Sequence, residues 1–133
     1  MAGWDAYITN MRENSPAITR AAIVGYPTGD IWARTEGGDN TFRATSAELS
    51  SFVKAFDDLS SLPSTGADLE GVHYIVPRTE ENLVFGKKDR HGFFAAKTSQ
   101  AVLIAIYEGE NHVSSEVRKA VENLAGHLTT NGY

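Results

Sequence analysis

Five residues with ring side chains, placed near the two ends of the chain and in one predicted strand, could bind a ligand. They are Trp4, Tyr7, Trp32, His127 and Tyr133. Indole and phenol rings offer broad apolar faces, and their N–H and O–H groups donate hydrogen bonds. Grooves lined by such rings bind polyproline II segments, which are already extended and therefore lose little entropy on binding. This set predicts a surface for a proline-rich ligand.

The same spacing also suits an ordinary buried helix face. Trp4, Tyr7, Ile8 and Met11 fall on one side of a helix, at positions i, i+3, i+4 and i+7. From periodicity alone, a core role for the first two is the more common outcome. Tyr133 favours ligand binding instead, because chain ends usually fray and a terminal aromatic has little reason to be buried.

Hydrophobic spacing and turn residues predict the elements that carry these rings. The first helix ends at residues 14–16, since the residue before proline avoids the helical region. Residues 21–35 predict a β-hairpin around a turn at 27–30, with 17–20 as a short turn before it. The tail 112–133 predicts an amphipathic helix that starts at Ser114 or Ser115 and ends near Gly132.

The middle of the chain predicts a second helix and four strands. Thr45 and Glu48 have the spacing of a capping box, which would begin a helix over 46–59. After a loop at 60–71, the predicted strands are 72–76, 82–85, 92–97 and 101–107. Their connections are too short for parallel crossovers, so neighbours must be antiparallel. The last strand has no polar side chain over 101–106, so both faces of the sheet should be covered.

The predicted fold class is therefore α/β of the α+β type, in a single domain over residues 1–133. A central antiparallel sheet would carry the N- and C-terminal helices on one face and the middle helix on the other. The net charge of −5 and the absence of cysteine exclude a strongly basic nucleic-acid binder, a disulfide framework and a thiolate metal site. No stretch approaches the ~20 apolar residues of a membrane span. The N-terminus lacks a signal-peptide pattern, so a cytoplasmic protein is expected.

Signatures of catalysis and of cofactor binding are absent from the sequence. HExxH, CxxC and GxSxG do not occur, and residues 86–92 lack the phosphate-loop pattern. The four histidines, at positions 73, 91, 112 and 127, show no metal-ligand spacing. The sequence therefore predicts no enzyme, no cofactor and no metal site.

A second set of residues is basic. It comprises Lys87, Lys88, Arg90, Lys97, Arg118 and Lys119, half of the twelve Lys and Arg in the chain. They occupy the predicted turns around the last two strands and the face of the final helix opposite its valines. Single lysines are usually solvated, but a cluster in an acidic protein indicates an acidic partner or anionic lipid head groups.

The whole chain resembles the profilin family in length and in the order of its elements. The most specific matches are GWDAY at 3–7, IWA at 31–33, FGKK at 85–88, KTSQA at 97–101 and the tail 124–133. The chain length and the segment 86–88 resemble the shorter plant and protist type more than the vertebrate type. The resemblance implies a six- or seven-stranded antiparallel sheet between helix layers. It also implies binding of monomeric actin, proline-rich segments and phosphoinositides.

The resemblance further implies residue roles and a mechanism. It assigns the proline-rich groove to Trp4, Tyr7, Trp32, His127 and Tyr133. It assigns the actin face to Lys87, Lys88, Arg90, Lys97, His112, Arg118 and Lys119. The implied protein is a monomeric, cytoskeleton-associated adaptor that regulates actin polymerisation and nucleotide exchange. One face would cap monomeric actin, the opposite face would bind proline-rich segments of formin-like polymerisation factors, and phosphoinositides would compete for the basic residues.

Two other classes remain open at this point. One is a small-molecule or enzymatic sheet domain, which a deep polar pocket with perturbed acids would favour. The other is a phosphoinositide or anionic-lipid binding module without actin activity. That module would keep its vesicle binding when Trp4 is replaced, and it would not respond to polyproline.

Overall fold

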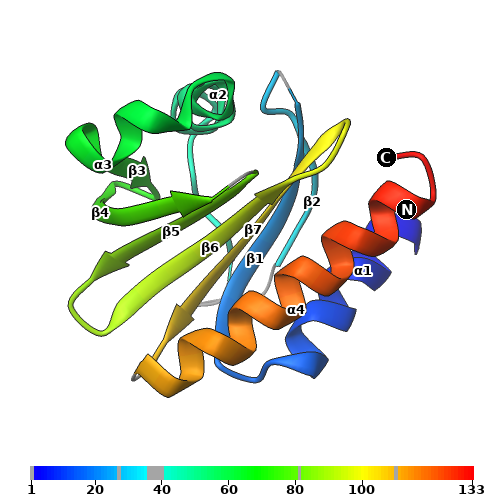
Figure 1. Ribbon diagram of the computed structural model, residues 1–133. Coiled ribbons are helices and arrows are strands. Elements are labelled where there is room, and N and C mark those ends of the chain that lie inside the picture. Colours follow the sequence, from blue (N-terminus) through cyan, green and yellow to red (C-terminus); the bar gives the residue numbers. More distant parts are fainter. Residues whose placement is uncertain (1, 27, 36–40, 81, 110) are drawn as a thin grey trace.

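The computed structural model describes residues 2–26, 28–35, 41–80, 82–109 and 111–133. Its helices and strands follow one another in the order labelled in Figure 1. The helices are α1 (Ala2–Asn14), α2 (Ser46–Lys54), α3 (Leu62–Thr65) and α4 (Asn111–Thr130), with short 3-10 turns at Ala55–Asp57 and Leu59–Ser61. The strands are β1 (Ile18–Gly25), β2 (Ile31–Arg34), β3 (Ala67–Leu69), β4 (Val72–Glu80), β5 (Leu83–Lys88), β6 (His91–Lys97) and β7 (Ala101–Glu108).

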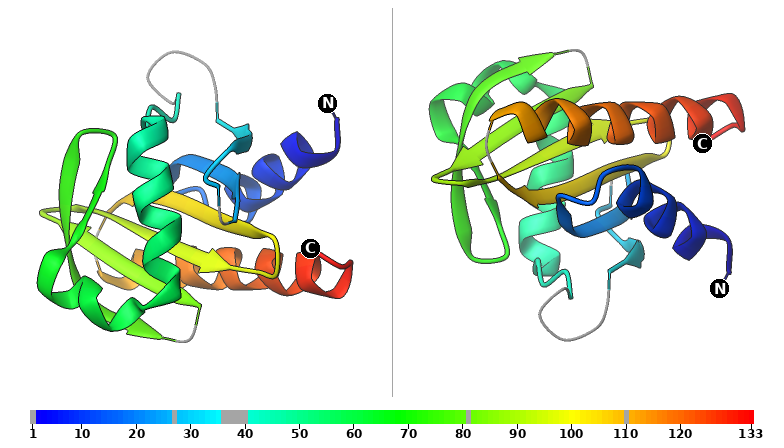
Figure 2. Two further views of the ribbon diagram at one scale, coloured as in Figure 1. Left: turned by 90° about the horizontal axis from the view of Figure 1, so that it is seen from above. Right: turned by 90° about the horizontal axis from the view of Figure 1, so that it is seen from below.

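Within the described residues, the strands form a seven-stranded antiparallel sheet in the order β2-β1-β7-β6-β5-β4-β3. The pairing of β1 with β7 joins the first strand in the sequence to the last, with Ala21 opposite Ala105. Helices α1 and α4 cover one face of the sheet, and α2 crosses the other, as Figure 2 shows from above and below. The predicted fold class and the predicted distribution of helices over the two faces are confirmed.

Strand β7 shows why both faces need a cover. Its side chains alternate between two hydrophobic clusters, and all of them from Ala101 to Ile106 are fully buried. Val102, Ile104 and Ile106 pack in the cluster beneath α2, whereas Leu103 packs in the cluster beneath the terminal helices. An entirely apolar strand is stable only between two such layers.

The helices bury the stripes that their spacing predicts. On the α2 face these residues are Leu49, Phe52 and Val53, and on the opposite face they are Ile8, Met11, Val117, Val121, Leu124 and Leu128. The capping box is present, because the Glu48 amide donates to Thr45 Oγ1 (3.1 Å) and the Thr45 amide donates to Glu48 Oε1 (2.9 Å). The Glu48 carboxylate also accepts from the Gly71 amide (2.8 Å), which fastens the β3–β4 turn to the start of α2.

Some predicted boundaries were wrong. The segment 17–20 is not a separate turn, because β1 begins at Ile18, which lies opposite Tyr107 of β7. The loop expected at 60–71 contains α3 and β3, and the latter is a three-residue edge strand that pairs with β4. The middle helix ends at Lys54 and continues as 3-10 turns. Helix α4 begins at Asn111, so the two serines at 114 and 115 lie inside it.

No helix in the described part of the chain is long and apolar enough to cross a membrane.

Candidate functional site

The five predicted ring residues lie together, and we call them the aromatic surface: Trp4, Tyr7, Trp32, His127 and Tyr133. The ring of Trp4 is central, with centroids 4.8 Å from Trp32, 5.0 Å from Tyr133 and 5.6 Å from Tyr7. Tyr7 continues the surface to His127, whose ring centroid is 5.6 Å away. These are the separations of tilted and edge-to-face aromatic pairs, which stabilise one another beyond simple burial. Residues from α1, β2, α4 and the last position of the chain therefore form one contiguous surface.

Backbone packing leaves room for this arrangement under the indole of Trp32. Gly25, at the end of β1, faces this indole across the β1–β2 hairpin. A Cβ atom at this glycine would lie 2.8 Å from Trp32 Nε1, closer than real contacts allow. The missing side chain therefore lets the Trp32 indole lie close to the backbone of β1, and the same indole contacts Trp4.

The aromatic surface packs against the core on its inner side and is exposed to solvent on its outer side. Trp4, Tyr7 and Trp32 pack against the cluster beneath the terminal helices, while Tyr133 keeps 38% of its surface exposed. Within the described part of the chain, the indole N–H groups and the hydroxyls of both tyrosines have no hydrogen-bond acceptor. Four donors thus stand on a surface of flat apolar faces. That combination suits a ligand that carries carbonyl acceptors and few donors.

A hollow of about 370 Å³ continues from the aromatic surface between α1 and α4. It is lined by Ala6, Tyr7, Asn10, Asn123, Leu124 and His127. An extended ligand lying on the rings could therefore run on between the two helices.

The basic residues, by contrast, do not form one cluster. Lys87 and Lys88 end β5, and Arg90 lies in the turn that leads into β6. Lys97 lies at the opposite end of β6, so about 20 Å of strand separates it from Lys88. Its ammonium instead lies 4.3 Å from the ring centroid of Tyr26 and donates to the Thr98 carbonyl (3.1 Å). Lys97 therefore belongs to the same end of the sheet as the aromatic surface.

The two basic residues of α4 differ from each other. Arg118 is half-buried and donates to Glu80 of β4 (2.7 Å) and to Glu122 one turn on (3.1 Å). These two carboxylates raise the pKa of the Arg118 guanidinium. Lys119, the next residue, is exposed. The side chain of His112 lies outside the described part of the structure.

One notable surface residue was not predicted from the sequence. Ile75 of β4 is 61% exposed, although its neighbours Tyr74 and Val76 are buried. It lies opposite Lys87 in the β4–β5 ladder. The sequence signal for Ile75 is a large aliphatic side chain at a position of the strand where alternation predicts a side chain that faces solvent.

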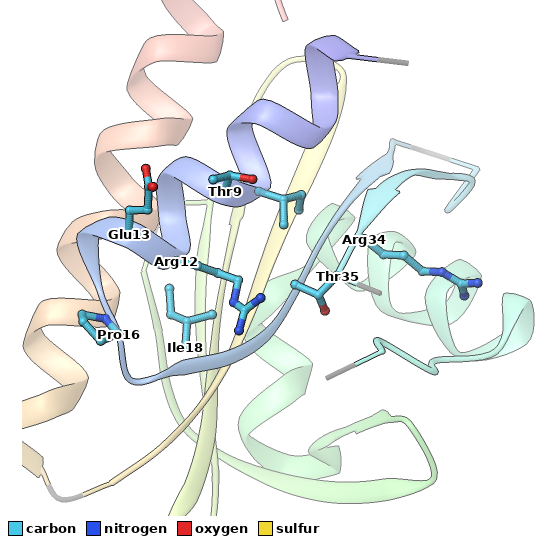
Figure 3. Close-up of a pocket in the computed structure, with 8 residues that line it drawn as sticks. Thr9, Arg12, Glu13, Pro16, Ile18, Arg34 and Thr35 are labelled. Atoms are coloured by element: carbon cyan, nitrogen blue, oxygen red, sulfur yellow. The ribbon is translucent and has the colours of Figure 1, made fainter. Parts of the chain in front are cut away.

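A larger hollow lies elsewhere, between α1 and the beginning of β1 (Figure 3). It measures about 570 Å³ and contains none of the predicted site residues. The guanidinium of Arg12 points into it, whereas Glu13, the one acid among the described residues that line it, points away. Within the described residues, no group of three or more His, Asp or Glu side chains could hold a metal ion. This hollow lacks the paired acids that the enzymatic alternative would need.

Comparisons with known proteins agree with this geometry. The sequence profile of the family described as Profilin matches residues 2–133. The chain is 56% identical to Profilin-1 of Caenorhabditis elegans over 133 residues, which cover 100% of both chains. It superimposes on the solved structure of Acanthamoeba castellanii profilin IB with a TM-score of 0.85 at 32% identity, covering 98% of this chain and 100% of that one.

A third comparison concerns a complex. Mouse profilin IIa, solved with a double repeat from the FH1 domain of mDia1, matches with a TM-score of 0.76 and covers 99% of this chain and 100% of its own. At 22% identity, this match shows the fold alone. The lower identity agrees with the expected distance from vertebrate members, although the nematode relative is more similar than the protist one.

A seven-stranded antiparallel sheet, with the two terminal helices and the aromatic surface on one face, defines a small domain of the mixed α/β class. The chain belongs to the profilin family, whose members are known to bind actin and polyproline.

Proposed function

We propose that this protein is a monomeric, cytoplasmic adaptor that binds monomeric actin on one surface and proline-rich segments on another. The observation that carries the proposal is the aromatic surface, whose four donors have no acceptor among the residues that the structure describes. A polyproline segment has carbonyl acceptors but no backbone N–H at proline, so it complements such a surface. Its rings would pack on the indole and phenol faces while its carbonyls accept from the donors. The mouse relative, bound to an FH1 repeat, supports a formin-like partner.

For actin, we propose a surface around the β5–β6 turn and the adjoining part of β4. Lys87, Lys88 and Arg90 provide positive charge there, and the exposed Ile75 provides an apolar contact. An apolar centre with a charged rim is the usual composition of a protein interface. Lys119 extends the charge onto α4, and we include Arg118 and His112 on the family resemblance alone. Lys97 is left out, because it lies at the other end of β6.

Actin bound in this way would be kept from spontaneous nucleation while it remains able to join fast-growing filament ends. A partner that prefers an open nucleotide cleft would also speed nucleotide exchange on actin, because binding shifts the population of actin conformers. Phosphoinositide head groups would compete for the same lysines by charge. The dispersal of the basic residues over two ends of the sheet favours this adaptor over a module dedicated to lipid, which would gather its cations on one side.

The test for the proline-rich surface is a titration of the protein with a proline decamer, followed by tryptophan fluorescence. Both tryptophans lie in the aromatic surface, 4.8 Å apart, so binding should change their emission. A Gly-Ser decamer serves as the control ligand. Unchanged emission at millimolar proline decamer would rule out this site.

The test for the actin surface is the rate of spontaneous polymerisation of actin with and without the protein. Slower nucleation, together with undiminished growth from filament seeds, is the expected result. Vesicles that contain phosphoinositide should reverse the effect, whereas neutral vesicles should not. An unchanged nucleation rate, with vesicle binding retained, would support the lipid module instead.

A further inference from the structure

Tyr133 contributes to the aromatic surface although it lies beyond the end of the helix that leads to it. Helix α4 ends at Thr130, and Gly132 has a φ of +91°, which turns the chain out of the helical path. Among the described residues, the bond from the Tyr133 amide to the Leu128 carbonyl (2.9 Å) is the one backbone bond that joins Tyr133 directly to α4. Such helix ends fray when nothing else holds them. The position of the Tyr133 ring therefore depends on contacts from outside the helix.

Those contacts come from the β6–β7 turn, residues 98–100. The hydroxyl of Thr98 donates to the main-chain oxygen of Tyr133 (2.7 Å), and the Gln100 amide donates to the same oxygen (2.6 Å). The Gln100 side chain adds a longer bond to the Gly132 carbonyl (3.3 Å). Two short bonds from the β6–β7 turn converge on one main-chain oxygen of Tyr133 and fix its backbone from outside α4.

Thr98 differs from an ordinary turn residue in its burial and in its bonding. It is only 5% exposed, and its hydroxyl oxygen also accepts from the Ala101 amide (3.1 Å). The hydroxyl oxygen is therefore held by the backbone of its own turn. Its single hydrogen has two acceptors in reach, the Ala101 carbonyl (3.3 Å) and the main-chain oxygen of Tyr133 (2.7 Å), and the second is the closer. The turn itself is anchored to the sheet, because the Tyr26 amide donates to the Gln100 carbonyl (2.9 Å).

We propose that Thr98 is a positioning residue of the proline-rich site: its buried hydroxyl holds Tyr133 against Trp4, so that the aromatic surface exists before a ligand arrives. This inference rests on the proposed function and adds a residue that touches neither ring nor ligand. A binding surface that is already ordered does not lose the entropy of fixing its side chains on binding. Loss of the hydroxyl removes the acceptor of the Ala101 amide and one of the two bonds from outside α4 to the main-chain oxygen of Tyr133.

The decisive variants are Thr98→Val, which keeps the branched shape and removes the hydroxyl, and Thr98→Ser, which keeps the hydroxyl. We expect Thr98→Val to weaken binding of the proline decamer on the order of tenfold, the range of one lost hydrogen bond. Thr98→Ser should restore most of the affinity. Ser99→Ala, a change at the exposed neighbouring hydroxyl, is the matched control and should bind like wild type.

A double-mutant cycle of Thr98 and Tyr133 distinguishes a positioning role of Thr98 from a general loss of stability. In a Tyr133→Ala background, Thr98→Val should cause no further loss of decamer affinity, because the ring that it positions is gone. The effect of the protein on actin nucleation should be unchanged in every Thr98 variant. Full additivity of the two substitutions, or equal decamer affinity of Thr98→Val and wild type, would overturn the inference.

A ligand-free readout keeps this inference distinct from the proposed function. The heteronuclear ¹⁵N NOE of the Tyr133 amide should be high in wild type and in Thr98→Ser, and low in Thr98→Val. If the wild-type protein does not bind the decamer, the proposed function is wrong. The NOE of the Tyr133 amide still decides whether Thr98 orders Tyr133. If wild type binds the decamer but the Tyr133 NOE is the same in all variants, the positioning role alone fails.

Discussion

The aromatic surface and the basic residues lie on the same small sheet, yet they are organised in opposite ways. The five rings come from three elements and the last residue of the chain, and they contact one another at 4.8–5.6 Å between centroids. The basic residues are spread over both ends of β6 and over α4, and Arg118 is already paired with acids of the protein itself. One set is assembled by contacts among its own members, whereas the members of the other lie apart from one another on several elements.

Physical chemistry accounts for the difference. Aromatic rings attract one another and lose water when they meet, so a cluster of them is stable without a ligand. Like charges repel and keep their hydration, so they gather only when a partner of opposite charge is present. We therefore expect changes in the aromatic surface to act through shape and contact. Changes among the basic residues should act through long-range attraction and depend on salt.

The largest effect is expected at the centre of the aromatic surface. Trp4→Ala removes the ring that contacts three others, and we expect it to cost about 2–4 kcal/mol in decamer binding, the usual value for a central aromatic residue. Trp32 remains as the fluorescent reporter.

Tyr133→Asp should abolish detectable decamer binding, because it places a negative charge among the carbonyls of the ligand.

The matched control for this pair is Ile75→Ala, which truncates an exposed side chain far along the sheet. We expect it to leave decamer affinity unchanged and to weaken the effect of the protein on actin nucleation. If Trp4→Ala instead impaired the actin effect and spared the decamer, the assignment of the two surfaces would be reversed.

A smaller effect is expected beneath the rings. Gly25→Ala places a methyl group where the Trp32 indole lies, and overpacking of this kind costs about 1–3 kcal/mol in the free energy of unfolding. Decamer binding should weaken as well, since the indole must move. Urea denaturation and the decamer titration measure the two effects.

Gly126→Ala, on α4, is the control for Gly25→Ala. A Cβ atom there meets nothing within 4 Å, and alanine favours the helix by about 0.5–1 kcal/mol, so this variant should be more stable than wild type. Equal destabilisation by the two substitutions would contradict the idea that Gly25 accommodates the indole.

The basic residues should respond to charge rather than to shape. Reversal of Lys88 and Lys119 to Glu is expected to cost about 1–2 kcal/mol in actin binding and to slow association, as for other charges near the rim of an interface. The loss should shrink as salt is raised. Decamer affinity should be unchanged, and loss of both activities would indicate misfolding. Lys97→Glu is the matched reversal at the other end of β6, and it should have the smaller effect on actin.

Local chemistry predicted much of this molecule. The capping box at Thr45 and Glu48 needs only residues three apart, and the apolar run at 101–106 lies within one strand, so both were visible in the sequence. Helical periodicity predicted the positions of Trp4, Tyr7 and His127, whereas Trp32 and Tyr133 were added to the ring set by residue type and by the family resemblance. The prediction that Lys97 clusters with Lys87 was wrong, and the sequence already held the reason. The predicted strand 92–97 separates the two residues by the full length of a strand.

What escaped prediction depends on contacts between distant segments. Residues 18–20 became a strand because they pair with the end of β7, almost ninety positions away. Strand β3 has three residues and exists only through its pairing with β4. The role of Thr98 was equally hidden, since a turn threonine shows no sign of the partner that its hydroxyl reaches at Tyr133. Pairings of this kind leave no local pattern in the sequence.

The smallest effect is expected at Arg118, where charge is already compensated inside the molecule. Arg118→Gln removes ion pairs to Glu80 and Glu122, and such partly exposed pairs contribute at most about 1 kcal/mol to stability. We expect the free energy of unfolding to fall by about half that amount at low salt and to match wild type in 1 M NaCl, because salt screens both pairs. Lys119→Gln, one residue on and at an exposed position, should leave stability unchanged at either salt concentration. If Arg118→Gln reduced actin binding more than Lys119→Gln, the paired arginine would be the stronger actin contact of the two, and the contrast between self-contained and partner-dependent charge would need revision.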